Sequence, residues 1–198
     1  MKLKNIGIVY LIAGLYYMIA ETICIFSVND TLFNTYVFHT ISDLGIPNGN
    51  CPFFFLMDSA FILIGLALVF ANLYKFKDFI IKHKVFFYLF TLIASVGVIM
   101  VGFIPWGNPL TNGYHNLGAI MAILGGNLML LTIFMSMAKI ETYQKISLIL
   151  GIIGLISFLI MFFNMESIYM PVFERLAVYP LIVWHLVTGV YLLKNTQL

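Results

Sequence analysis

Six stretches of this sequence are long and apolar enough to cross a lipid bilayer, and they limit the fold more than any other feature. A membrane-spanning helix needs about 20 predominantly apolar residues. The six stretches lie at about 5–26, 53–74, 85–105, 113–138, 146–164 and 174–194. Of the 198 residues, 62% are hydrophobic and only 9% are charged, whereas a soluble domain carries about 25% charged residues. We therefore predict an all-α integral membrane protein in which residues 1–198 form a single transmembrane domain, a six-helix bundle.

The lysines predict how this bundle lies in the membrane. Lysine and arginine are enriched in the cytoplasmic connections between membrane spans. Every lysine flanks a predicted span on the same side of the bundle; these residues are Lys2, Lys4, Lys75, Lys77, Lys82, Lys84, Lys139, Lys145 and Lys194. We therefore expect this side, with both the N and C termini, to be cytoplasmic in a multi-pass protein of the cell membrane. The first run is too long for the apolar region of a signal peptide, so we expect it to be retained.

The connection at 27–52 is expected to form a structured outer loop. It contains no lysine or arginine, and a connection of this length usually has structure of its own. Phe33, Tyr36 and Phe38 suit a segment that lies at the level of the lipid headgroups. Residues 39–45 then place an imidazole, two hydroxyl groups and a carboxylate just before a glycine, which permits a sharp turn.

The costly polar groups of the chain gather on this predicted outer side. An ionisable side chain near the centre of a membrane helix costs about 2.5–3.5 kcal/mol on insertion scales, so such groups are functional candidates. We expect an outward-facing polar pocket formed by Glu21, His39, Ser42, Asp43, Asp58, His115, Glu174, Arg175 and His185. His185 is expected to lie deepest, because it follows Glu174 by nearly three full helical turns.

The charges of the outer half favour a cation as the ligand. Its carboxylates are Glu21, Asp30, Asp43, Asp58, Glu166 and Glu174. They face one basic residue, Arg175, and an acidic mouth of this kind attracts a proton, a metal ion or an amine. A divalent metal is a candidate cofactor, because carboxylates and imidazoles bind such ions; its candidate ligands are Asp43, Asp58, His115 and His185. The sequence has no HxxxH, HExxH or CxxC spacing to strengthen this hypothesis.

Several of these residues also have structural interpretations. Ser42 and Asp43 can cap a short helix within the outer loop. His115 can satisfy backbone groups at the end of a helix, and His185 can hydrogen-bond across helices.

Arg175, the only arginine, is expected to be the electrostatic centre of the outer site. It can form a structural ion pair with Glu174. Neighbouring residues point about 100° apart on a helix, so the guanidinium group can instead bridge carboxylates from other helices. Asp43 and Asp58 are the partners we expect.

The two cysteines, Cys24 and Cys51, are a disulfide candidate. They fall at the outer ends of the first two predicted helices. If these ends are neighbours, the thiols can meet at the roughly 5.5–6 Å Cα separation that a disulfide needs, in a compartment that permits oxidation.

Several short motifs together resemble a known family. They are His39–Gly45 with its Ile-Ser-Asp-Leu-Gly core, Val101–Pro105, His115 with Gly118 and Ala119, and Glu174 and Arg175 with Tyr179 and Trp184. In this order they resemble the six-span membrane proteins catalogued as domain of unknown function 998. The resemblance covers nearly the whole chain and implies a six-helix membrane protein, but it implies no activity. Ile104 stands where that family is expected to have a tighter Phe-Pro pair.

Two classes of function fit these observations. The first is a non-enzymatic membrane protein whose polar pocket binds a lipid headgroup or a small cation, as a carrier, sensor or accessory protein. The second is a metal-dependent intramembrane lipid hydrolase with Asp and His ligands, similar in residue types to alkaline ceramidase-like hydrolases but lacking their HxxxH spacing. Membrane lipids are the expected partners in either case, nucleic acid is not expected, and no protein partner is predicted.

Overall fold

The computed structural model describes residues 3–74, 76–137 and 141–194, and within these residues every regular element is a helix. The long helices are α1 (Leu3–Ser27), α3 (Phe54–Ala67), α4 (Lys84–Phe103), α5 (Asn112–Ser136), α6 (Glu141–Phe163) and α7 (Met170–Lys194). A π-helical turn, η2 (Leu68–Asn72), continues α3 without a break. Six helices are therefore long and apolar enough to span a membrane, which confirms the all-α prediction and the number of candidate spans.

The starts of α6 and α7 differ most from those that the apolar runs predict. Helix α6 begins at Glu141 rather than near residue 146, because its first turn is polar although it is helical. Helix α7 begins at Met170 rather than near residue 174. Its second residue, Pro171, is tolerated because the first N–H groups of a helix need no intrahelical acceptor. Glu174 and Arg175 consequently lie in the second turn of α7 and do not open the helix.

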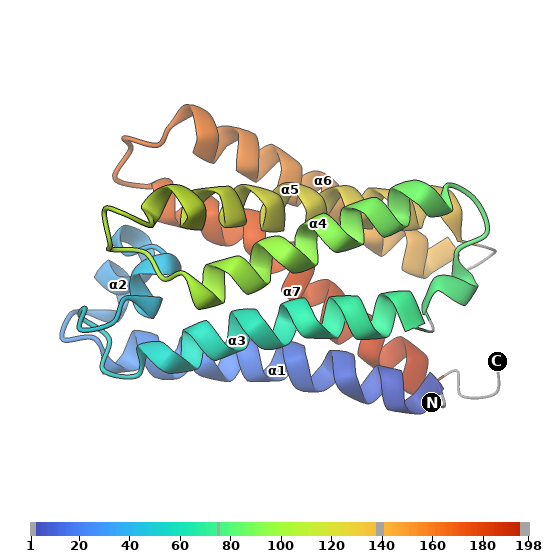
Figure 1. Cartoon of the computed structure of the whole chain (residues 1–198), viewed down its shortest axis with the longest axis horizontal. Helices are drawn as coiled ribbons and strands as arrows, with labels where there is room; N and C mark the ends of the chain where they lie inside the picture. Colours follow the sequence, from blue (N-terminus) through green and yellow to red (C-terminus); the bar gives the residue numbers. More distant parts are fainter. Residues whose placement is uncertain (1–2, 75, 138–140, 195–198) are drawn as a thin grey trace.

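The six long helices lie side by side, and their connections alternate between the two ends of the molecule (Figure 1). Helix α1 packs against α3 and α7, α4 packs against α3 and α5, and α6 packs against α5 and α7. Helix α1 begins and α7 ends at the right-hand end in Figure 1, which we call the terminal end. The opposite end carries α2 (Leu32–Phe38), and we call it the α2 end.

Small residues let α4 and α5 approach closely. A Cβ atom added at Gly97 would lie 2.4 Å from the Ala122 backbone nitrogen and 2.5 Å from the Gly118 carbonyl oxygen. Any larger side chain at this position would force the two backbones apart. Close contact through small residues is the usual way in which membrane helices associate.

The connection between α1 and α3 contains α2 and a short 3-10 helix, η1 (Ser42–Gly45). The Thr31 side chain caps α2 by accepting a hydrogen bond of 3.2 Å from the Asn34 backbone. Phe33 and Phe38 leave 68% and 43% of their surfaces exposed. The segment therefore covers the α2 end of the bundle and presents aromatic side chains outward.

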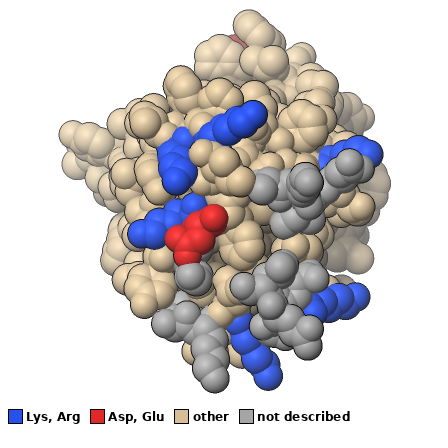
Figure 2. All heavy atoms as spheres, turned by 90° about the vertical axis from the view of Figure 1, so that its right-hand side faces the viewer, with Lys and Arg blue, Asp and Glu red and all other residues tan. Residues whose placement is uncertain are grey.

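Basic side chains gather at the terminal end (Figure 2). The described lysines are Lys4, Lys77, Lys82, Lys84, Lys145 and Lys194, while Lys2, Lys75 and Lys139 lie outside the described residues. A cytoplasmic position for this end remains a prediction from the lysine pattern.

Candidate functional site

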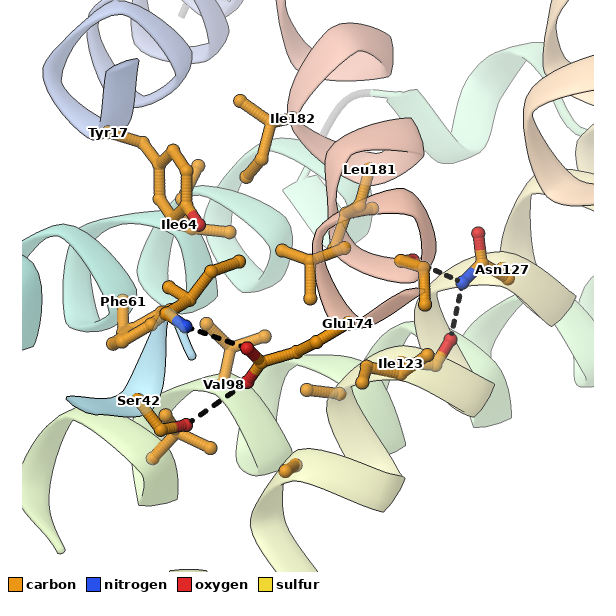
Figure 3. A pocket seen from close by; sticks show the side chains of 16 residues that line it. Tyr17, Ser42, Phe61, Ile64, Val98, Ile123, Asn127, Glu174, Leu181 and Ile182 are labelled. Carbon is orange, nitrogen blue, oxygen red and sulfur yellow. Dashed lines mark hydrogen bonds between the residues drawn. The ribbon is translucent and has the colours of Figure 1, made fainter. Parts of the chain in front are cut away.

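A cavity of about 50 Å³ lies at the centre of the bundle, and all the long helices except α6 contribute to its wall (Figure 3). Most of the wall is aliphatic or aromatic. Its polar members are Tyr17, Ser42, Asn127 and Glu174. Ile41 and Ser42, just before and at the start of η1, also line it, so the start of η1 forms part of the wall.

Glu174 attaches η1 to α7. Its Oε2 atom accepts a hydrogen bond of 2.7 Å from the Ile41 backbone nitrogen, and its Oε1 atom lies 3.4 Å from the Ser42 hydroxyl oxygen (Figure 3). One carboxylate thus holds the segment that forms this part of the wall.

His115 extends this contact to α5 and α4. Its Nε2 atom lies 3.0 Å from the Ser42 hydroxyl oxygen, and its Nδ1 atom lies 2.6 Å from the Ile104 carbonyl oxygen. Because a carbonyl oxygen only accepts, Nδ1 must carry a proton. Ile104 is the C-terminal cap of α4, so the predicted role of His115 at a helix end is confirmed. The contact with Ser42 was not predicted.

The hydrogen-bond chain Glu174–Ser42–His115 lacks a proton when Glu174 is a carboxylate and His115 is neutral. The Ser42 hydroxyl then has two acceptor neighbours and one hydrogen, so one contact is left without a donor. With one added proton, both contacts become hydrogen bonds. Either a His115 imidazolium donates to Ser42 and Ser42 donates to Glu174, or a Glu174 carboxylic acid donates to Ser42 and Ser42 donates to His115. The 3.4 Å between Ser42 and Glu174 is long for a bond between oxygens, which is commonly about 2.7–2.8 Å.

Arg175 lies beside this chain but makes separate contacts. Its Nε atom donates to Glu21 Oε1 at 3.2 Å, and its Nη1 atom donates to the His39 carbonyl oxygen at 2.7 Å. The guanidinium carbon lies 4.6 Å from the centre of the Tyr36 ring. With 1% of its surface exposed, Arg175 is the buried centre of a polar cluster.

The partners predicted for Arg175 are wrong. Glu174 points to the other side of α7 and bonds to η1, as the rotation of about 100° between neighbours requires. Asp43 and Asp58 make no ion pair with Arg175 among the described residues. Glu21 takes this place because α1 packs directly against α7.

Two tyrosines complete the Arg175 cluster. The Tyr179 hydroxyl donates to Glu21 Oε1 at 2.9 Å and lies 2.5 Å from the Tyr36 hydroxyl. Tyr179 follows Arg175 by one helical turn, a spacing that places both on one face. That spacing could have identified Tyr179 from the sequence. Nothing in the sequence identified Tyr36, because its contact depends on how α2 folds back.

Asp43 has a local structural role. Its Oδ2 atom accepts from the Thr40 backbone nitrogen at 2.8 Å, and its own backbone nitrogen donates to the Thr40 hydroxyl oxygen at 2.9 Å. This reciprocal pair stabilises the start of η1 in the manner of a capping box. The capping interpretation is therefore confirmed for Asp43 and wrong for Ser42, which bonds to Glu174 and His115.

The predicted metal ligands do not converge. Among the described residues, no group of three or more His, Cys, Asp or Glu side chains could hold a metal ion. Asp58 is half-buried on α3 beside Gly45, where an added Cβ would lie 2.6 Å from its Oδ1 atom. His185 lies about 16 Å along α7 from Glu174. Its Nδ1 atom bonds to the Leu181 carbonyl oxygen of the same helix at 2.8 Å, so the predicted bond across helices is also wrong.

The polar residues predicted to share one pocket lie in separate places. A second hollow of about 230 Å³ on the outer side of η1 is lined by Val28, His39, Asp43, Leu44, Ile46, Gly49, Asn50 and Cys51. His39 Nε2 lies 3.6 Å from Asp30 Oδ2. Hydrogen bonds from Asn34 and from the Thr31 backbone, together with His39, lower the pKa of the exposed Asp30 carboxyl group. His39 and Asp43 therefore face a different space from Glu174.

The predicted disulfide is not formed. Cys24 and Cys51 are both free and buried. The Cys24 thiol donates to the Phe53 carbonyl oxygen at 3.4 Å and also interacts with the Cys51 side chain. Cys51 Sγ lies 3.5 Å from the Ser27 hydroxyl oxygen.

Comparisons of the whole chain with families of known proteins, with curated proteins and with solved structures find no match.

Proposed function

We propose that this protein is a membrane carrier or sensor that binds a proton at the hydrogen-bond chain Glu174–Ser42–His115. The observation that carries the proposal is the proton count of this chain. It has two titratable ends, one hydroxyl between them and one contact that only an added proton can fill. A half-buried carboxylate and a buried imidazole joined in this way form a single acceptor for one proton.

Other ligands fit the central cavity less well. A volume of about 50 Å³ has room for water but not for a lipid headgroup. A divalent metal needs several oxygen or nitrogen ligands, and the described residues offer no such group. The charge of Arg175 is compensated by Glu21, and only 1% of the surface of Arg175 is exposed to an anionic headgroup.

The orientation of this site in the membrane and the family of the chain are proposed from the sequence. We propose that the terminal end is cytoplasmic and that the α2 end faces the outside of the cell membrane, as the lysine pattern predicts. We also propose membership of the six-span family catalogued as domain of unknown function 998, on the motifs given above. Both proposals agree with six apolar helices.

Proton uptake by the purified protein tests the proposal. Over the pH range in which the protein stays folded, the parent should take up one more proton per molecule than Glu174→Gln. Glutamine can accept from Ile41 and donate to Ser42, so this variant should keep its fold. Glu166→Gln is the matched control, because Glu166 is exposed at the same end and lies outside the hydrogen-bond chain Glu174–Ser42–His115. Equal uptake by the parent and Glu174→Gln would contradict the proposal. Liposomes with a pH gradient then separate a carrier, which dissipates the gradient, from a sensor, which does not.

The Ser42–His115 contact supports one other candidate, a serine hydrolase. A nucleophile within 3.0 Å of a base that is itself held by Ile104 resembles an activated serine. Two nearby backbone N–H groups that could stabilise an oxyanion, those of Ile41 and Asp43, are already occupied. A fluorophosphonate probe should therefore leave the parent unlabelled. Labelling that is lost in Ser42→Ala would favour the hydrolase.

A further inference from the structure

The exposed lysines of the terminal end form a charged surface that the proton-binding chain does not use. The described members of this surface, which we call the lysine surface, are Lys4, Lys77, Lys82, Lys84, Lys145 and Lys194, and all of them are exposed. Basic side chains spread across this face of the molecule (Figure 2). Within the described part of the chain, no ion pair neutralises any of these ammonium groups. Positive charges that are left uncompensated in this way attract anions.

The connection between α3 and α4, which carries several of these lysines, is fixed to the bundle. Phe76 leaves only 1% of its surface exposed, and the centre of its ring lies 5.7 Å from that of Trp184. The Ser136 carbonyl oxygen, at the end of α5, accepts hydrogen bonds of 2.8 and 3.2 Å from the backbone nitrogens of Ile81 and Lys82. The backbone that carries the lysines is therefore in place before a ligand binds, which lowers the ordering cost of binding.

Exposed apolar side chains lie directly beside these lysines in the chain. Ile81 precedes Lys82 and leaves 57% of its surface exposed. Val85 and Phe86 follow Lys84 in the first turn of α4 and leave 74% and 54% exposed. This combination suits the boundary of a bilayer, where apolar groups enter the hydrocarbon region and the long lysine side chains reach the headgroups. A soluble anion or a nucleic acid would leave the apolar side chains in water.

The charge of this connection selects among headgroups. Asp78 is the one acidic residue between residues 73 and 83, and it already interacts with another group. Lys77, Lys82 and Lys84 therefore leave an excess of positive charge. Lysines close to the membrane attract anionic lipids, whereas a zwitterionic headgroup has no net charge to attract them.

We propose that the lysine surface binds the headgroups of anionic phospholipids in the leaflet at the terminal end. The proposal requires that the six candidate spans cross a membrane. It goes beyond the proposed function and does not rest on it, because the hydrogen-bond chain Glu174–Ser42–His115 and its proton play no part in lipid binding.

Fluorescence quenching by spin-labelled lipids tests this proposal in reconstituted vesicles. Val85→Cys and Phe103→Cys carry a bimane label at opposite ends of α4, at positions that are 74% and 70% exposed. Cys24 and Cys51 are buried, so the reagent should label the introduced cysteine. At position 85, spin-labelled phosphatidylglycerol should quench more strongly than the same amount of spin-labelled phosphatidylcholine. At position 103, the matched control, the two lipids should quench equally.

The lysines must account for this preference. Lys77→Gln, Lys82→Gln and Lys84→Gln together should abolish the preference at position 85, and these exposed positions should accept glutamine without unfolding. Salt should also weaken the preference in the parent, because it screens exposed charges. Equal quenching at position 85 in the parent, an equal preference at position 103, or a preference that neither salt nor the three glutamines weaken would overturn the proposal. Inorganic phosphate should act no more strongly than chloride at equal ionic strength. A specific loss of the preference in phosphate would assign the lysines to a soluble anion instead.

Discussion

Arg175 and Glu174 are neighbours in the chain, yet each serves a different helix. Arg175 is paired with Glu21 on α1, and both side chains are nearly inaccessible to solvent. A buried ion pair adds little net stability when compared with an apolar pair, but removal of one partner leaves a buried charge uncompensated. The stability of the α2 end should therefore depend strongly on Arg175.

We predict that Arg175→Ala and Arg175→Lys both lower the midpoint of thermal unfolding in detergent. Loss of one partner from a buried pair typically costs about 3–5 kcal/mol. Lysine keeps the charge but lacks the planar group that reaches Glu21 and the His39 carbonyl oxygen together. Lys145→Ala, a change at the exposed terminal end, serves as the control. If both Arg175 variants unfold at the same midpoint as the parent, the Arg175–Glu21 pair does not determine the stability of the α2 end.

At the residue scale, the sequence identified the important side chains better than their partners. The isolated charge of Arg175 within an apolar helix was enough to mark it as central. Its partner Glu21 depends on the rotation of α7 relative to α1, which the apolar pattern does not determine because these helices are apolar on nearly every face. The sequence also did not predict that Ser42 links Glu174 to His115, because these contacts join residues far apart in the sequence.

Helix α2 is too short to be stable alone, because isolated helices of fewer than about 12–15 residues are marginal in water. It has 7 residues and is held by contacts at both ends. The Arg175 side chain binds the His39 carbonyl oxygen, and Asp30 bonds to Thr31 and Asn34 at the start of the helix. The acidic group at the helix start also interacts favourably with the helix dipole.

We predict that the Asn34 side-chain amide reports the titration of Asp30 at low pH. Because the pKa of Asp30 is lowered from its ordinary 3.8, its contribution to stability is present above that value and is lost as the pH falls through the lowered pKa. The NMR shift of the amide should change with a midpoint below 3.8. Asp30→Asn should show no such step. A midpoint at or above 3.8 in the parent would contradict the capping contact.

At the element scale, the apolar runs predicted all six long helices because a bilayer requires a fixed length of apolar residues. Their starts were missed where polar residues occupy the first turn, as in α6 and α7. The apolar pattern stops at such a turn, while the backbone hydrogen bonding does not.

At the scale of the whole molecule, the separation of charge between the two ends is the main indication of orientation. Described lysines lie at the terminal end (Figure 2), whereas the Arg175 cluster, which contacts His39, lies at the α2 end. Cysteine labelling of intact cells tests the predicted topology. Asn48→Cys, at the α2 end, should be modified by an impermeant reagent, and Lys77→Cys should be spared. The reverse pattern would place the α2 end in the cytoplasm.

The central claim is that Glu174 and His115 share one proton through Ser42, and an infrared titration of the Glu174 carboxyl group tests it most directly. The band is assigned by its absence from Glu174→Gln. His115→Asn removes one of the two groups that share the proton. We therefore predict that the Glu174 carboxyl band appears or changes its midpoint relative to the parent. An identical band with an identical midpoint in the parent and in His115→Asn would show that the two groups bind protons independently, contrary to this account.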